Sequence, residues 1–424
     1  MRRVVLMLAL VFAGELVFGL VFNVPRFFRP TMLEVFGISN TELGDMFAVY
    51  GVFAMLAYFP GGAIADRYSA RALIAVSLVA TSVGGVYMAT IPGVLGMQIL
   101  YGYWGLTSIF LFWGALIRAT RDWGGGQSQG VAFGILDGGR GLVAAFVAMI
   151  GVYILAFYLP DNARLATAEE RETGFRSVVM FYTLLTFISG VFSWYAIPEE
   201  KRMDIAKFNP LKGMATVMRR PIIWAQAGII VCAYCGYKGL DNFSLYAVQV
   251  LGMDEVDGAR LASYGAWTRP IAAVLAGLIA DRYQAARSIG VIFAILGVSC
   301  FAWSSTVPSG SGMTIIYLNF FTTFGAVYAL RGIYFALLEE NSTPKFLTGA
   351  AVGLVSLIGY TPDVFFGPIT GRILDANPGL VGHQNYFLFL ASVATLGILM
   401  VAWLLWLRRQ GGEKLWQAVK IDEK

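Results

Sequence analysis

Eight ionisable side chains lie within long apolar stretches of this sequence, where burying a charge is costly. The four basic residues are Arg140, Lys238, Arg269 and Arg331, and the four acidic residues are Glu15, Asp137, Asp241 and Asp363. Ionisable residues in such surroundings commonly mark the path of a substrate or an ion. The chemistry available to these residues is the binding of anions by guanidinium groups and the carriage of protons by carboxyl groups.

Two of the arginines have no acidic residue three or four positions away along the chain. Arg269 and Arg331 therefore need an acceptor from elsewhere, and a carboxylate, phosphate or sulfonate would accept both arms of a guanidinium. We predict that Arg269 and Arg331 bind an anionic group of a substrate, with Arg140 as a third candidate. The alternative is that these arginines pair across helices with Glu15 or Asp363.

The remaining basic residues have acidic neighbours at helical spacing. Asp137 and Arg140 are three residues apart, and so are Lys238 and Asp241. Side chains at this spacing lie on one face of a helix. Each pair can therefore also be a local structural ion pair, which lowers the cost of burial.

Three carboxyl groups are candidates for proton coupling. Glu15, Asp363 and Asp137 lie in apolar runs, and a carboxyl group in a low-dielectric interior binds a proton more readily than one in water. We predict that one of them carries the coupling proton. A structural carboxylate that is paired with an arginine is the alternative for each.

The composition indicates a membrane protein with many spans. Hydrophobic residues make up 58% of the 424 residues and charged residues only 13%, against about a quarter in soluble domains. Runs long enough to cross a bilayer recur along the chain. The runs are approximately 4–24, 43–64, 72–91, 93–117, 129–158, 176–196, 222–251, 258–280, 286–306, 312–337, 347–371 and 384–407. We predict an all-α polytopic fold of twelve transmembrane helices.

A charged turn is repeated at half the chain length. Gly61-Gly62-Ala63-Ile64-Ala65-Asp66-Arg67-Tyr68-Ser69-Ala70-Arg71 recurs as Gly277-Leu278-Ile279-Ala280-Asp281-Arg282-Tyr283, and Asp66 and Asp281 are 215 residues apart. Such a repeat predicts two copies of one unit. We expect a six-helix bundle over 1–196, a linker over 197–220, and a second bundle with a short tail over 221–424.

The distribution of basic residues predicts the orientation. With an even number of spans both termini lie on one side, and most lysines and arginines fall in the loops of that side. Short cytoplasmic loops carry this excess of positive charge. We expect both termini and both charged turns to be cytoplasmic, in the plasma membrane or bacterial inner membrane. The net charge of +5 then needs no nucleic-acid partner.

The repeated turn, placed after the second and eighth runs and joined by a basic central loop, resembles the major facilitator superfamily over essentially the whole chain. The resemblance implies two bundles that rock about a central cavity, with the turns as a cytoplasmic gate. The candidate gate residues are Gly62, Asp66, Arg67, Arg71, Arg118, Asp281 and Arg282. The alternative is that these charges only set the orientation.

Two departures argue against the drug antiporters of that superfamily. The fourth run, with Gln98 and Tyr101, contains no arginine, and the fifth, from Gly130 to Gly141, contains no proline. Small residues four apart in the fifth and eleventh runs resemble the solute-uptake branches, including organic-anion and sugar-phosphate porters.

The sequence thus predicts a secondary transporter and not an enzyme. We expect proton-coupled uptake of a small anionic or polar organic solute by a monomer, without a cofactor or metal. No nucleotide-binding loop is present to couple transport to ATP. The alternatives are export of an amphiphilic compound and a transporter-like solute sensor.

Overall fold

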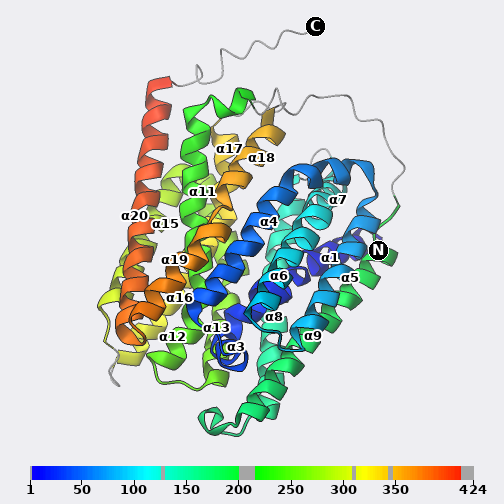
Figure 1. The fold of residues 1–424 in the computed structure, drawn as a ribbon. Coiled ribbons are helices and arrows are strands. Elements are labelled where there is room, and N and C mark those ends of the chain that lie inside the picture. The colour runs from blue at the N-terminus through cyan, green and yellow to red at the C-terminus, as the bar shows by residue number, and fades with distance from the viewer. Residues whose placement is uncertain (1, 126–128, 200–214, 308–311, 342–346, 412–424) are drawn as a thin grey trace. The chain divides into compact units, whose positions relative to one another are not determined.

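The computed structural model describes residues 2–125, 129–199, 215–307, 312–341 and 347–411. Within these ranges all regular secondary structure is helical (Figure 1). The chain forms two compact units. Unit 1 comprises Met1–Arg202, Leu240–Pro270 and Asp363–His383, and unit 2 comprises Met203–Gly239, Ile271–Pro362 and Gln384–Lys424. Each unit therefore draws on both halves of the sequence. Most of the predicted linker, 200–214, lies outside the described residues.

Unit 1 contains the helices of the N-terminal half and three shorter pieces of the C-terminal half. From the N-terminal half come α1 (Arg2–Leu16), η1 (Gly19–Asn23), α2 (Val24–Phe27), α3 (Arg29–Phe36), α4 (Asn40–Arg67), α5 (Ala70–Met88), α6 (Val94–Gly105), η2 (Leu106–Trp113), α7 (Gly114–Gly124), α8 (Gln129–Tyr158), η3 (Ala163–Leu165) and α9 (Ala168–Ala196). The later pieces are η4 with α12 (Leu240–Asn242, Phe243–Gln249), α13 (Glu255–Ala266) and most of α19 (Pro362–Ala376).

Unit 2 contains the remaining helices of the C-terminal half. These are α11 (Pro221–Gly239), α14 (Thr268–Tyr283), α15 (Ala285–Ser305), α16 (Met313–Ile333), η6 (Tyr334–Ala336), α17 (Leu337–Glu340), α18 (Thr348–Gly359) and α20 (Leu380–Gly411). The first three residues of α14 and the first four of α20 belong to unit 1.

The helices agree with the predicted apolar runs. Nine helical stretches among the described residues are long and apolar enough to cross a membrane. The other three runs coincide with α4, which carries charges at both ends, with α11 and α12, and with α13 and α14, which the chain breaks at Trp267. The prediction of an all-helical polytopic fold is confirmed.

Polar side chains define where several helices begin and end. Ser39 and Thr167 each form a capping box, in which the hydroxyl accepts from the backbone N–H of Glu42 or Glu170 and that glutamate accepts in return. At the charged turn, α4 ends at Arg67 and Ser69 caps α5 by accepting from the N–H of Ala72 at 3.3 Å. Such caps satisfy the backbone groups that a helix end leaves without an intrahelical partner.

The internal repeat extends to individual hydrogen bonds. In unit 1 the hydroxyls of Thr81 and Thr107 lie 2.9 Å apart, and in unit 2 those of Ser299 and Thr323 lie 2.6 Å apart. The second pair follows the first by about half the chain length. An indole N–H supports each pair, from Trp104 to the carbonyl of Thr81 and from Trp303 to the hydroxyl of Thr323. The two halves therefore join their third and fourth spans in the same way.

Glycine allows α4 and α19 to touch through their backbones within unit 1. A Cβ atom on Gly44 would lie 2.5 Å from the carbonyl carbon of Gly367, and one on Gly367 would lie 2.8 Å from the carbonyl oxygen of Gly44. One turn or two further along α4, a Cβ on Gly51 would lie 2.6 Å from the carbonyl carbon of Asp363. No larger residue fits at these positions unless the two helices move apart.

We therefore expect Gly44→Val to destabilise the protein in detergent. Forcing atoms into a filled contact costs roughly 1–3 kcal/mol, which lowers the thermal unfolding temperature by several degrees. Gly134→Val in α8 is the control, because a Cβ atom there meets nothing within 4 Å. Equal unfolding temperatures for the two variants would show that the contact between α4 and α19 is not tight.

Candidate functional site

Four of the eight buried ionisable residues come together in unit 1. Glu15 on α1 faces Arg140 on α8 and Arg269 at the start of α14, with N–O distances of 3.4 and 3.7 Å. Arg269 also forms a 2.6 Å ion pair with Asp137 on α8. We call Glu15, Asp137, Arg140 and Arg269 the charge cluster. It contains two guanidinium and two carboxyl groups, so its formal charges balance when all four are ionised.

The members of the charge cluster differ in exposure. The side chains of Glu15, Arg140 and Arg269 are 4–8% exposed, whereas that of Asp137 is 35% exposed. The Glu15 carboxylate also accepts a 3.0 Å hydrogen bond from the amide of Asn23. Asp137 is therefore the member that solvent or a solute reaches most easily, and Glu15 is the one held most firmly by its neighbours.

The backbone near the charge cluster makes room for the two arginines. A Cβ atom on Gly14 would lie 3.1 Å from Cδ of Arg140, and one on Gly141 would lie 2.8 Å from Cδ of Arg269. Between Glu15 and Asn23 the α-helix gives way to the π-helix η1, a rare geometry that is frequent at functional sites. The helices thus approach closely enough for both guanidinium groups to reach one carboxylate.

The structure decides between the alternatives for Arg269. It pairs across helices with Glu15, as one interpretation of the sequence held, and also with Asp137, which neither interpretation included. Glu15 was expected to lack a basic partner within its own helix, and it obtains two from other helices. Whether substrate displaces one of these partners is a separate question, which these contacts do not answer.

The other predicted residues lie elsewhere. Asp241 forms a buried 2.6 Å ion pair with Arg26. Asp363 lies at the start of α19, where its backbone touches Gly51 of α4. Arg331 belongs to unit 2, with its guanidinium 4.1 Å from the ring centre of Tyr237, and Lys238 is buried on α11.

Sequence analysis placed Arg26 and Arg29 in a solvent-facing loop, and this is wrong. Both are buried, with exposures of 4% and 3%, because α2 and α3 continue the first span. Arg26 and Asp241 are separated by 215 residues, the same spacing as the two copies of the charged turn. That shared spacing is the signal that could have revealed the pair.

These arginines belong to a polar network at the end of unit 1 formed by residues 25–40, 164–171, 241–255 and 372–375, here called the distal end. Thr31 donates to Glu255 at 3.0 Å, and Arg171 pairs with the same carboxylate at 2.7 Å. Asp375 accepts from the backbone N–H of Thr41 at 2.7 Å. The network connects segments from both halves of the sequence, so opening the distal end would break several charged hydrogen bonds.

The candidate gate residues at the charged turns show contacts typical of helix ends. Arg118 donates to the carbonyls of Ala65 and Tyr68 at the end of α4. Arg71 pairs with Glu199 at 3.3 Å and lies 4.5 Å from the ring of Trp194. The side chain of Asp66 lies outside the described part of the chain, so its expected pairing with Arg118 stays a prediction.

The remaining gate candidates are exposed. Arg67, Asp281 and Arg282 face outward, and Arg282 covers the ring of Tyr283 at 5.5 Å. A Cβ atom on Gly62 would meet nothing within 4 Å. The close approach expected there occurs one residue earlier, where a Cβ on Gly61 would lie 3.0 Å from the carbonyl oxygen of Phe110.

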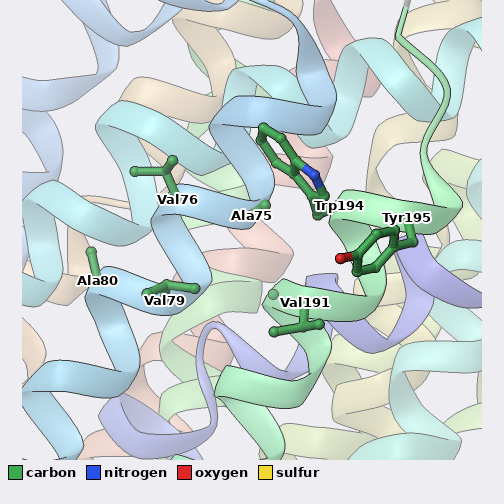
Figure 2. A pocket seen from close by; sticks show the side chains of 8 residues that line it. Ala75, Val76, Val79, Ala80, Val191, Trp194 and Tyr195 are labelled. Atoms are coloured by element: carbon green, nitrogen blue, oxygen red, sulfur yellow. The ribbon is translucent and has the colours of Figure 1, made fainter.

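An apolar groove of about 420 Å³ lies between α5 and α9, away from the charge cluster (Figure 2). Its lining residues are Ala75, Val76, Val79, Ala80, Gly190, Val191, Trp194 and Tyr195. None of these is charged, and Tyr195 is 81% exposed at the end of α9. The groove suits a hydrocarbon chain and offers nothing to hold an ionic solute.

Relatives support the same architecture. The chain is 26% identical over 413 residues to "Inner membrane protein YqcE" of Escherichia coli K12, which covers 94% of this chain and 93% of that one. It is 24% identical over 299 residues to "Probable nitrate/nitrite antiporter NarK1" of Thermus thermophilus, covering 68% and 63%. The crystal structure of the nucleoside transporter NupG matches with a TM-score of 0.73 at 12% identity, covering 95% and 100%.

The sequence model of the Major Facilitator Superfamily matches residues 11–363, which is most of the chain. The resemblance inferred from the two charged turns is thereby confirmed at the level of the superfamily, while the branch is not resolved. This protein is a multi-pass membrane protein, is not an enzyme, and belongs to the Major Facilitator Superfamily of secondary transporters.

Proposed function

We propose that this transporter takes up a small anionic or polar organic solute together with protons. The solute would be of the organic-acid, sugar-acid, sugar-phosphate or sulfonate type. The observation that carries the proposal is the position of Arg269, a buried guanidinium whose closest partner, Asp137, is the most exposed member of the charge cluster. An anion that arrives from solvent meets this pair before the deeper Glu15.

The charge balance of the cluster links solute binding to protonation. If an anion takes the place of Asp137 beside Arg269, the released carboxylate is left in a poorly solvated position, which is costly. A proton on Asp137 removes that cost and leaves the total charge unchanged. Solute and proton therefore favour each other's binding, and this mutual dependence is what a symporter requires.

The other charged residues have supporting roles in this scheme. Arg140 and Asn23 hold Glu15 in place, so that Arg269 keeps one carboxylate partner while Asp137 is released. Arg331 is the second anion-binding candidate, from unit 2. Glu15 and Asp363 remain alternative proton carriers.

The proposal includes the orientation and the gate. With both termini in the cytoplasm, the basic loops face anionic lipid, and the distal end faces outward. The contacts of Arg118 and Arg71 at the charged turn then belong to the cytoplasmic side. We further propose that this turn and its repeat act as the cytoplasmic gate of a monomer in the inner membrane.

Replacing Arg269 should abolish transport with little change in expression. In Arg269→Gln the anion loses its charged hydrogen bonds, and such losses cost about 2–5 kcal/mol, which is roughly thirtyfold or more in affinity. The measurement is uptake into proteoliposomes. Its solutes are chosen by a thermal-shift screen of uronic acids, hexose phosphates, alkanesulfonates and cationic dyes.

Arg260→Gln is the matched control for that variant. Arg260 also lies beside an aspartate, Asp257, but its side chain is 38% exposed at the start of the same span. Normal uptake by Arg269→Gln would contradict the anion site. Stabilisation by cationic dyes alone would favour the export of an amphiphile, and binding without any uptake would favour a solute sensor.

Replacing Asp137 should separate binding from coupling. Asp137→Asn is permanently neutral, so Arg269 can accept an anion at any pH, and no proton is carried. We expect this variant to exchange external for internal solute but not to accumulate solute when the outside is more acidic. Accumulation that keeps the pH dependence of the unchanged protein would assign the proton to another group, and the same assay on Glu15→Gln and Asp363→Asn would identify it.

A further inference from the structure

Five tyrosines gather around Arg331 in unit 2, and the scheme above does not use them. The rings of Tyr234 and Tyr237 on α11 are stacked with centres 5.8 Å apart, and Tyr360 meets Tyr234 edge-on at 4.9 Å. Tyr328 on α16 lies 6.3 Å from Tyr237, and the hydroxyls of Tyr334 and Tyr360 are 3.5 Å apart. We call these five residues and Arg331 the tyrosine cluster.

The tyrosine cluster has a buried base and a partly exposed face. Tyr234, Tyr328 and Tyr334 are 7%, 2% and 3% exposed, whereas Tyr237, Tyr360 and Arg331 are half-buried. The buried rings fix the positions of the other three side chains. Because buried tyrosine rings have only two side-chain torsions to restrain, they provide a rigid wall at low entropic cost.

Helices are interrupted where the tyrosine cluster lies. The α-helix α16 ends at Ile333 and continues as the 3₁₀ turn Tyr334–Ala336, and α18 ends at Gly359, before Tyr360 and Thr361 separate it from α19. Inside a membrane protein, irregular backbone is tolerated where it is buried in protein or lines a cavity. In transporters, substrate sites are typically formed at such discontinuous helices.

The groups on the exposed face match a hydroxylated ring better than a simple anion. The guanidinium of Arg331 is oriented by its stacking on Tyr237, 4.1 Å from the ring centre, and it donates in the plane of its nitrogens. The phenol hydroxyls of Tyr237 and Tyr360 both donate and accept, as sugar hydroxyls require. A short carboxylate or an inorganic anion needs the arginine and has no use for the tyrosines.

We propose that Tyr237, Tyr360 and Arg331 form a subsite for the body of the solute, and that the solute is a sugar derivative with one anionic group. This inference rests on the proposed uptake of an anion and narrows its class. Arg331 binds the anionic group or a neighbouring hydroxyl, and the two phenols bind ring hydroxyls.

The test compares anions with and without a hydroxylated ring, using the full chain in proteoliposomes. D-glucuronate and glucose 6-phosphate are the ring probes, and lactate and nitrate are the simple probes. We expect uptake of at least one ring probe and neither simple probe. Uptake of lactate or nitrate without a ring probe would overturn the subsite while leaving anion uptake intact. If none of the four is taken up, the subsite is overturned together with the anion proposal.

Two variants that keep the aromatic rings test the phenol groups directly. Tyr237→Phe and Tyr360→Phe should each raise KM for the ring probe about tenfold, the effect of losing one hydrogen bond, while Vmax changes little. Tyr317→Phe on the same α16 is the control, since that side chain is 38% exposed and outside the cluster. Unchanged KM values in both test variants would refute the role of the phenols.

Discussion

The structure depends on the cost of placing a guanidinium group in a poorly solvated interior. Arg26, Arg140 and Arg269 are each at most 6% exposed, and each lies beside a carboxylate from another helix. Removing one partner from such a pair typically costs about 3–5 kcal/mol, because the other charge is left uncompensated. The helices that carry these residues are therefore held to particular neighbours, and any conformational change must exchange one counter-charge for another.

That requirement distinguishes the two charged regions of unit 1. At the distal end, Arg26 pairs with an aspartate that is as buried as itself, in a network that also holds Glu255 and Asp375. The pair closes together with the backbone contact between α4 and α19, which suits a structural closure. In the charge cluster, Arg269 instead has one deep partner and one that is partly exposed. This asymmetry allows one partner to leave while the other stays.

Much of the fold was predictable because membrane helices have strong sequence signals. Long apolar runs located the helices, and the charged turn at Asp66 and Asp281 identified the repeat and the superfamily. The ionisable residues were located by the same logic. Their partners were not predictable, since Glu15, Asp137 and Arg269 come from three helices whose rotation depends on packing. Gly61, and not Gly62, makes the close approach for the same reason.

The errors have physical causes of the same kind. Arg26 follows Pro25, and proline together with arginine suggested that the first span had already left the membrane. The chain instead continues through η1 and α2, and the ion pair with Asp241 offsets the burial of Arg26. The tyrosine cluster lacked a sequence signal because its members come from two long helices and two interruptions, which no single periodicity connects.

The central claim is that an anion and a proton enter the charge cluster together, and proton uptake on binding tests it most directly. Purified protein in weakly buffered detergent, with a pH indicator, is mixed with an anion that stabilises it. The account predicts that the unchanged protein takes up about one proton per bound anion and that Asp137→Asn takes up none. Binding of the anion with no change in the indicator of the unchanged protein would contradict it.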